Sequence, residues 1–471
     1  MDLKLALAKA FSNSVPTKIV HLAVLKASEA AYARACNPSI KVFSFEEFRD
    51  ENQSYDLETE KLRLLKTYPT VNWSSVLLSE RSFFDVCDLQ GGIGQRRVTL
   101  EYTQRLLIEL IQFSELLMRL DPSVMVAQTP DSLMTLVLYK IAHSFSVPVR
   151  GLSPAWITPS NQPSGFLTED EFLHSPSMQH AFDRYKKCQL TDADIARAED
   201  FRKDITIFDA NAVYKTVTGV SFGRSAISPN IKNIFNYISQ NRKRREEVEY
   251  FKFSIKEKIT ANIKRFYRKK VLNTYIQKNS RTLPNLFVFL PFHFQPEAST
   301  LVGGIGYADQ AALAEMILKT LPFGWSLVIK EHPAGRGTRP ISHYKRLLSY
   351  PNVVFSDENS KYILKRCDAV ITVTGTIGLE ALAFDKPVLM FGNWFWDFSD
   401  LIYKISSLSE LEKTLREILL DRLYEKQENR ERRIQKALVS YLDGLIPYPL
   451  QATSAQYYVT EILNSIRQNR T

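Results

Sequence analysis

The sequence has few cysteines and no long uncharged apolar run. Its four cysteines are far apart and include no Cys-x-x-Cys pair, which argues against a disulfide framework and a cysteine-rich zinc site. No stretch of about 18 uncharged apolar residues occurs, so we expect no transmembrane helix. Residues 1–18 are interrupted by Lys4 and Lys9 and lack the pattern of a signal peptide. These absences predict a cytoplasmic protein.

The chain has enough hydrophobic residues to form more than one core, and it has one strongly basic segment. The chain has 471 residues, of which 45% are hydrophobic, so it is long enough for two or three domains. Of the net charge of +10, residues 232–281 contribute 15 Lys and Arg against four Glu. The remainder of the chain is therefore nearly neutral.

The basic segment has Phe, Tyr and Ile at roughly helical spacing, with Lys and Arg between them. This pattern favours a helix that lies on an anionic membrane surface, such as the inner face of the cytoplasmic membrane. A solvated helix or linker has the same pattern. No recognisable nucleic-acid-binding module occurs, so we expect no nucleic acid partner.

The second half of the chain alternates between short apolar strands and helices. We expect strands at 285–290, 326–330, 352–355, 369–373 and 387–391, with helices at 308–321, 343–350, 361–367 and 379–384. Unbroken apolar strands separated by helices predict a parallel sheet covered on both faces. Such doubly wound domains bind their ligands at the carboxyl ends of the strands.

The first half has the same alternation, less regularly. We expect strands at 39–45, 123–128 and 147–152, and helices at 101–120 and 132–145. The prediction is an α/β protein with two doubly wound, Rossmann-like domains and a cleft between them.

Chemically useful residues follow the predicted strands of the second half, so the fold should bring them to one sheet edge. They are His293, Gln295, Glu297, Gly303 and Gly304 in PFHFQPEASTLVGG (291–304), Lys330, Glu331, His332 and Pro333 in KEHPAGRG (330–337), and Thr374, Gly375, Thr376 and Glu380 in TGTIGLE. A fourth stretch after a predicted strand, SDENSKYI (356–363), offers residues that can cap a helix. A cation, an imidazole and a helix N-terminus together describe a site for a phosphorylated ligand. Each motif on its own also has a purely structural explanation: a histidine after a strand can simply be hydrogen-bonded within the protein, and TGT can simply cap a helix.

FQPEAST followed by GG and DQ, then KEHP, then TVTGTIGLEAL with KPV, resembles the capsule polysaccharide biosynthesis family of bacterial glycosyltransferases. Its members include transferases of Kdo and of sialic-acid-like sugars. The resemblance covers residues 285–395. It is looser at SERSF (79–83) and at QTPDSLMTLVLYKIAHSFSVPV (128–149).

The resemblance implies a GT-B fold in which the second domain binds a nucleotide-sugar donor and the first binds a glycan or glycolipid acceptor. The expected organisation is an acceptor domain (1–230), a basic linker (231–282), a donor domain (283–445) and a helix returning to the first domain (446–471). His332 and Pro333 would lie against the nucleotide, with Thr374, Gly375 and Thr376 at its phosphate. Glu380 could accept hydrogen bonds from the ribose.

The implied reaction is transfer of a sugar from a CMP-linked donor to a glycan hydroxyl, in surface polysaccharide synthesis. Many relatives carry serines where this chain has Thr374 and Thr376, and often a histidine where it has Asp131. Lys330 and His332 would stabilise the leaving phosphate without a metal or other cofactor. Asp131 and Glu80 are the candidates for the base, although a carboxylate in such a turn is also a helix cap.

Three other functions are compatible with these motifs: a UDP-sugar 2-epimerase, a CDP-polyol phosphotransferase of related fold, and a non-enzymatic export scaffold. The basic segment argues against the epimerase, and FQPEAST with DQ argues against the phosphotransferase. In the loop GNWFWDFSD (392–400), Trp394 and Trp396 are expected either to stack on a ligand or to wedge the domains together.

Overall fold

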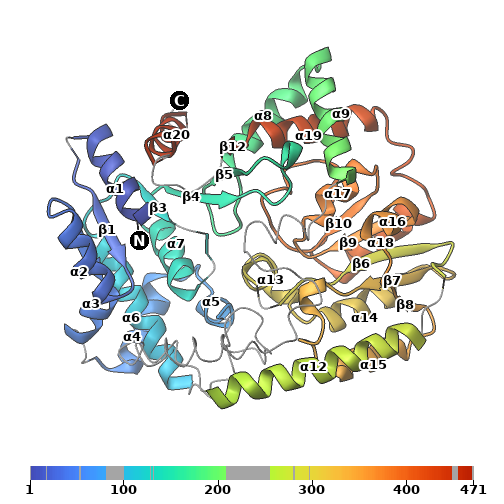
Figure 1. The fold of residues 1–471 in the computed structure, drawn as a ribbon, viewed down its shortest axis with the longest axis horizontal. Coiled ribbons are helices and arrows are strands. Elements are labelled where there is room, and N and C mark those ends of the chain that lie inside the picture. Colours follow the sequence, from blue (N-terminus) through green and yellow to red (C-terminus); the bar gives the residue numbers. More distant parts are fainter. Residues whose placement is uncertain are drawn as a thin grey trace.

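The structure of the protein, a computed structural model, describes residues 2–16, 18–51, 55–80, 100–127, 129–130, 132–207, 255–278, 282–295, 297–447 and 455–468. These residues form two α/β units that lie side by side, one from each half of the chain (Figure 1). Both units contain parallel strands, so the predicted α/β fold class with two Rossmann-like units is confirmed.

The C-terminal unit is built on a six-stranded sheet of order β11-β10-β9-β6-β7-β8, in which every pairing is parallel. Its strands are β6 (Phe287–Pro291), β7 (Ser326–Lys330), β8 (Val353–Phe355), β9 (Ala369–Thr372), β10 (Val388–Met390) and β11 (Ile402–Lys404). The register pairs Val288 with Leu327 and with Ala369.

Helices cover both faces of this sheet. They are α13 (Ala298–Leu301), α14 (Gln310–Thr320), α15 (Ile341–Leu348), α16 (Ser360–Arg366), α17 (Ile377–Ala383), α18 (Leu408–Leu419) and α19 (Arg430–Asp443), with short 3₁₀ turns at Ile305–Tyr307 and Pro333–Gly335. Side chains alternate along β6, so Phe287 and Phe289 enter one buried cluster and Val288 and Leu290 the other. This explains why the strand has no polar position.

The N-terminal unit has two smaller sheets. Strands β1 (His21–Val24) and β2 (Lys41–Ser44) pair in parallel, and β12 (Ile446–Pro447), β5 (Ser164–Thr168), β4 (Val149–Pro154) and β3 (Met125–Ala127) form a mixed sheet in that order. The helices are α1 (Asp2–Ser14), α2 (Ala27–Cys36), α3 (Phe45–Glu51), α4 (Leu57–Thr67), α5 (Trp73–Leu78), α6 (Leu100–Met118) and α7 (Leu133–Ser144), with a 3₁₀ turn at Pro159–Asn161. The antiparallel pairings of β5 with β4 and β12 distinguish this sheet from the C-terminal one.

The two units are interleaved along the chain. Helices α8 (Pro176–Lys187) and α9 (Asp192–Ile207) pack on α19, and Phe166 and Phe201 share one buried cluster with residues of the C-terminal sheet. In the other direction, β12 joins the N-terminal sheet, and α20 (Ala455–Gln468) packs on α1. The expected acceptor domain (1–230) therefore includes helices that pack with the second unit.

The loop after β10 lies in the contact between the units. Trp396 is fully buried, and the ring of Phe395 lies 4.7 Å from that of Phe166. Trp394 is also buried. Of the two roles expected for the tryptophans, the wedge between domains is the one that this packing matches.

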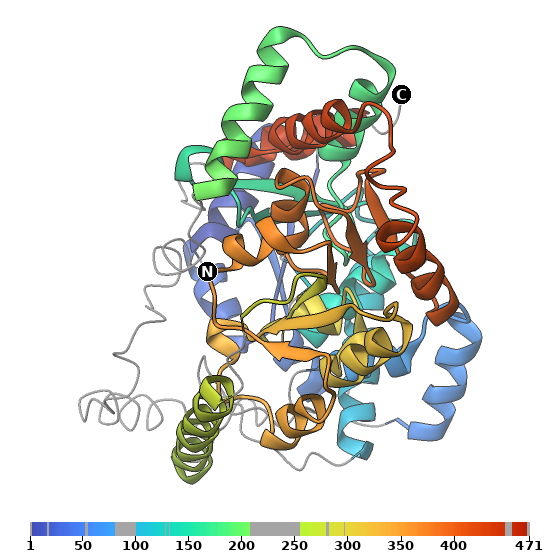
Figure 2. The ribbon, with the colours of Figure 1, turned by 90° about the vertical axis from the view of Figure 1, so that its right-hand side faces the viewer.

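Helix α12 (Ile255–Lys278) runs along the outside of the C-terminal unit, against α15 (Figures 1 and 2). Leu272 and Ile276 on its inner face are buried. The rest of the predicted basic segment, 232–254 and 279–281, lies outside the described residues. Among the helices that the structure describes, none has the length and apolar content needed to cross a bilayer.

Candidate functional site

Three loops meet at the carboxyl edge of the C-terminal sheet. They follow β9, β6 and β7, which are neighbours in that order. The carboxyl ends of parallel neighbours lie at the same edge, so the predicted residues of the second half come together there. The contacts between these side chains indicate which of them are used internally and which remain available to a ligand.

His293, from the loop after β6, holds the turn after β9. Its Nε2 accepts hydrogen bonds from the main-chain N–H groups of Val373 (3.3 Å) and Thr374 (3.5 Å) and lies 3.1 Å from Oγ1 of Thr372. Burial lowers the pKa of His293 to about 3, so the ring is neutral. With Nε2 accepting, the ring proton is on Nδ1. His293 therefore positions the turn.

Arg339 joins the loops after β6 and β7. Its Nε donates to Oε2 of Glu331 (2.9 Å), and its Nη1 donates to Oε1 of Gln295 (2.7 Å). Nη2 donates to the main-chain oxygen of His293. The guanidinium lies over the ring of Phe292, 4.9 Å from its centre. Arg339 was absent from the residues predicted from the sequence, because it lies in a stretch with no strand-end signal.

The carboxylate of Glu331 is the centre of this network. It is 2% exposed, and besides Arg339 it accepts hydrogen bonds from the N–H of His332 (2.9 Å) and the hydroxyl of Tyr344 (2.6 Å). Four bonds at most fill a carboxylate, and three are made here. The side chain therefore points into the protein and fixes the backbone of the following histidine.

His332 and Pro333 begin a 3₁₀ turn after β7. Nδ1 of His332 accepts a hydrogen bond from the N–H of Ala334 (3.1 Å), and the ring lies beside that of Phe294. Burial lowers the pKa of His332 to about 4, although nearby Glu331 opposes this. The imidazole is thus neutral at pH 7, with its proton on Nε2. The predicted set therefore contains one neutral imidazole beside the cation Lys330.

Lys330, at the end of β7, is the cation of the predicted set. Its Nζ donates to the main-chain oxygen of Glu358. Burial lowers the pKa of Lys330, and the nearby Asp357 and Glu358 carboxylates work in the opposite direction. The loop after β8 therefore also contributes to this edge.

The Thr374-Gly375-Thr376 turn is partly occupied by internal bonds. Oγ1 of Thr374 donates to the main-chain oxygen of Ser299 (2.9 Å), and the N–H of Gly375 donates to Oγ1 of Thr372 (3.0 Å). Thr376 is the N-cap of α17 but makes no capping bond with its side chain. Of the two predicted threonine ligands, Thr376 is the one whose hydroxyl makes no hydrogen bond within the described part of the chain.

Glu380, one turn into α17, is 8% exposed. Burial raises its pKa to about 7, and Lys361 and Lys330 offset part of that effect. In the described part of the chain its carboxyl group has no hydrogen-bond partner. A buried acid without a partner at this sheet edge is a candidate to accept a hydrogen bond from a ligand hydroxyl.

Gly303 and Gly304 pack against protein. A Cβ on Gly303 would lie 2.7 Å from the main-chain oxygen of Ser299, and one on Gly304 would lie 2.2 Å from Cγ1 of Val373. Their small size allows the loop to reach the turn after β9.

Gln295 and Glu297 lie just before α13. Nε2 of Gln295 donates to the main-chain oxygen of Ala308 (2.5 Å), and the Glu297 carboxylate accepts from Oγ of Ser299 (3.3 Å). Both side chains are partly exposed. Nearby, Val302 packs against the core of the N-terminal unit, so this loop touches both units.

The two predicted bases belong to the N-terminal unit. Glu80 is 8% exposed and follows α5, which packs on α7. Asp131 lies outside the described residues. No group of three or more His, Cys, Asp or Glu side chains with metal-binding geometry occurs in the part of the chain that the structure describes.

Comparison with known proteins finds a family match in the second half of the chain. Residues 218–426 match the family described as "Capsule polysaccharide biosynthesis protein". Protein FixF of Sinorhizobium fredii is 24% identical over 136 residues, which cover 27% of this chain and 32% of that protein. The chain thus spans about a third of the length of this curated relative.

Among solved structures, the chain is similar to the beta Kdo 2,7 transferase of Thermosulfurimonas dismutans KpsC, at 14% identity and a TM-score of 0.35. That match covers 78% of this chain and 97% of the other. It is also similar to UDP-GlcNAc 2-epimerase from Neisseria meningitidis, at 13% identity and a TM-score of 0.26, with 94% of each chain covered.

The motifs that indicated a family in the sequence, FQPEAST, KEHP and TVTGTIGLEAL, all lie inside the matched region. The resemblance found in the sequence and the family match thus fall on the same part of the chain, residues 218–426.

Proposed function

We propose that the protein is a glycosyltransferase of surface polysaccharide synthesis, with a nucleotide-sugar donor bound at the carboxyl edge of the C-terminal sheet. The observation that carries this proposal is the convergence of the loops after β6, β7 and β9, which His293 and Arg339 lock together within the matched family region. A rigid edge of this kind holds ligand-binding groups in a fixed geometry before the ligand arrives.

In this proposal the donor is a CMP-linked sugar, of the Kdo or sialic-acid-like class. The nucleotide lies against His332 and Pro333. Lys330 and the hydroxyl of Thr376 face the phosphate, and Glu380 accepts from the ribose. As the bond from the sugar to the phosphate oxygen breaks, these donors stabilise the charge that develops on the leaving group.

The acceptor, a glycan or glycolipid hydroxyl, approaches from the N-terminal unit. Its oxygen forms the new bond to the anomeric carbon, and its proton passes to a carboxylate. Asp131 and Glu80 remain the proposed bases.

A second part of the proposal concerns the membrane. On α12, Ile263, Phe266 and Tyr267 are exposed, and their spacing places them on one face of the helix. Lys264 and Lys270 are exposed beside them. An outward apolar and aromatic face among lysines suits the interface of an anionic bilayer. The protein would then work as a peripheral protein on the cytoplasmic side of the membrane, where a lipid-linked acceptor is presented.

The experiment that tests the donor site is a thermal-unfolding and calorimetric comparison of CMP, CDP, UMP and UDP. A ligand at a hundred times its Kd stabilises the native state by about 2.7 kcal/mol. We expect CMP to stabilise the protein most, and Thr376→Val to remove that effect. Thr460→Val, an exposed position on α20, is the matched control and should bind as the wild type does.

Preference for UDP would instead favour an epimerase or a UDP-sugar transferase, and preference for CDP would favour a polyol phosphotransferase. If none of the four nucleotides stabilises the protein, the proposed donor site is wrong.

A further inference from the structure

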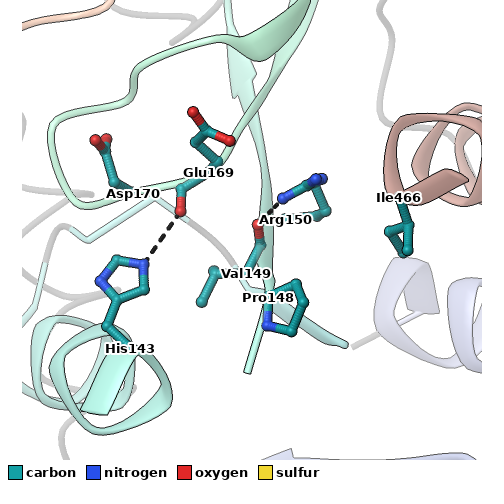
Figure 3. Close-up of a pocket in the computed structure, with 7 residues that line it drawn as sticks. All are labelled: His143, Pro148, Val149, Arg150, Glu169, Asp170 and Ile466. Carbon is teal, nitrogen blue, oxygen red and sulfur yellow. Dashed lines mark hydrogen bonds between the residues drawn. The ribbon is translucent and has the colours of Figure 1, made fainter. Parts of the chain in front are cut away.

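The N-terminal unit contains a pocket of about 450 Å³ that is separate from the candidate donor site (Figure 3). It lies between the last turn of α7, the start of β4, the segment after β5, and α20. The start of β4 is the end of the strand opposite to its carboxyl edge, so the pocket opens away from the edge where a doubly wound sheet binds its usual ligand.

Arg150 is the charged group of this pocket. It is 3% exposed, and every acceptor that it contacts is neutral. Nε donates to Oγ of Ser465 (2.9 Å), Nη1 to the main-chain oxygen of Val149 (2.7 Å), and Nη2 to the main-chain oxygen of Ser465 (3.5 Å). A guanidinium has five N–H groups, so two have no partner among the described residues.

No carboxylate of the described residues forms an ion pair with Arg150. A buried charge without a counter-charge is costly, because it has left water and gained no full electrostatic partner. Burial accordingly lowers the pKa of Arg150, and the more distant Glu169 offsets only part of this. A bound anion would supply the missing partner.

The acidic groups of the pocket limit the charge that such an anion can have. Asp170 is already neutralised, because its Oδ2 lies 2.5 Å from Nδ1 of His174. Burial disfavours charge on His174, but hydrogen bonds to Asp170 and Asp397 raise its pKa to about 10. Glu169 makes no side-chain bond within the described part of the chain, so its charge faces any ligand. One negative charge is balanced by Arg150, whereas two would meet repulsion from Glu169.

The same groups favour a ligand that carries hydroxyls. The Glu169 carboxylate can accept from them, and the imidazole of His143, whose Nε2 lies 3.3 Å from the main-chain oxygen of Glu169, borders the same space. A volume of about 450 Å³ is within the usual range for small-molecule sites.

We propose that this pocket binds an acidic monosaccharide unit, with its single carboxylate on Arg150 and its hydroxyls toward Glu169 and His143. The site is independent of the proposed donor site, since it shares no residue with it. It gives the N-terminal unit a place to hold an acidic sugar outside the cleft.

The test is a saturation-transfer NMR titration of the full chain with glucuronate, galacturonate and N-acetylneuraminate, and with glucose and glucose 6-phosphate as neutral and doubly charged comparisons. We expect at least one acidic sugar to bind about tenfold more tightly than glucose, which is the effect of one hydrogen-bonded charge pair. Glucose 6-phosphate should bind more weakly than that acidic sugar.

Two variants connect the binding to the proposed residues. Arg150→Met should weaken binding of the acidic sugar about tenfold or more without lowering the unfolding temperature, because it removes an unpaired buried charge. Glu169→Gln should strengthen that binding. Arg119→Met, at an arginine with a 71% exposed side chain, is the control and should change neither measurement.

Several outcomes would overturn the proposal. They are equal binding of glucose and the acidic sugars, tighter binding of the phosphate, no binding of any acidic sugar, or binding that Arg150→Met leaves unchanged. Loss of binding with a large fall in unfolding temperature would assign Arg150 a structural role instead. None of these measurements uses a nucleotide, so a failed donor proposal does not affect them.

Discussion

Among the described residues, each unit buries one arginine, and the two arginines have very different surroundings. In the C-terminal unit, Arg339 meets the Glu331 carboxylate and two further oxygens from the loop after β6. In the N-terminal unit, the oxygens that Arg150 meets among the described residues are all neutral. The first arrangement has its counter-charge, Glu331, without a ligand and holds the loops of a site. The second is electrostatically incomplete.

This contrast follows from how each sheet is made. The C-terminal sheet comes from successive strand-helix pairs, so its polar strand ends are neighbours and can satisfy one another. The N-terminal mixed sheet ends on β12, and Arg150 is held by Ser465 of α20. Distant segments therefore supply its partners.

The largest effect should come from breaking the complete network. Arg339→Met leaves the buried Glu331 carboxylate without its cation, and we expect the free energy of unfolding to fall by about 3–5 kcal/mol. Urea denaturation measures this. Arg346→Met is the control, because its partly exposed pair with Glu315 contributes about 1 kcal/mol or less. Equal effects of the two substitutions would contradict the role of the network.

A smaller, pH-dependent effect should come from Glu380, the buried acid of the C-terminal edge that has no hydrogen-bond partner in the described chain. Burial raises its pKa from 4.5 to about 7, so between these values the unfolded state loses a proton that the folded state keeps. The contribution of this carboxyl group to the free energy of unfolding is fully present below pH 4.5. It declines as the pH rises through 7, by about 3 kcal/mol in all.

Glu380→Gln removes this titration. Relative to the wild type, the variant should gain stability between about pH 5 and about pH 8, as measured by urea denaturation at both values. If the stabilities of the two proteins depend on pH in the same way, Glu380 titrates as it does in the unfolded chain. The comparison of paired with unpaired buried charges would then not extend to Glu380.

The smallest effect on folding is expected where the side chains face solvent on α12. Replacing Phe266 and Tyr267 together by serine should change the free energy of unfolding by no more than about 0.5 kcal/mol. The same substitutions should reduce sedimentation with phosphatidylglycerol vesicles by about tenfold or more, because aromatic burial in the interface is lost. Phe323→Ser removes another fully exposed aromatic and is the control. Unchanged vesicle binding would refute the proposal that this face of α12 binds the membrane.

The sequence predicted the C-terminal sheet closely, because its strands are continuous apolar runs. The expected strand at 326–330 is β7 without change, and the expected strand at 369–373 is β9 with one residue fewer. The expected helix returning to the first domain, within 446–471, corresponds to α20. Short strands with weaker patterns, β11 and the two-residue β12, could not be recognised because their pairing depends on tertiary contacts.

The candidate site could be predicted as a set of loops but not as a set of roles. Strand order brings His293, His332 and Thr374 to one edge, as expected. That His293 and Thr374 are bonded internally, and that Trp396 is buried against Gly378, depends on distances that no spacing rule contains. Arg339 was missed for the same reason, since its importance lies in the three partners that the fold brings to it.

The return of β12 and α20 to the N-terminal unit has a consequence for the order in which the protein is completed. Arg150 and Ser465 are separated by 315 residues. At roughly 5–20 residues per second, a ribosome needs on the order of 15 to 60 s to synthesise the intervening chain. During that time the edge of β5 lacks its neighbour and α1 lacks α20. The unit that is made first is thus among the last to be finished.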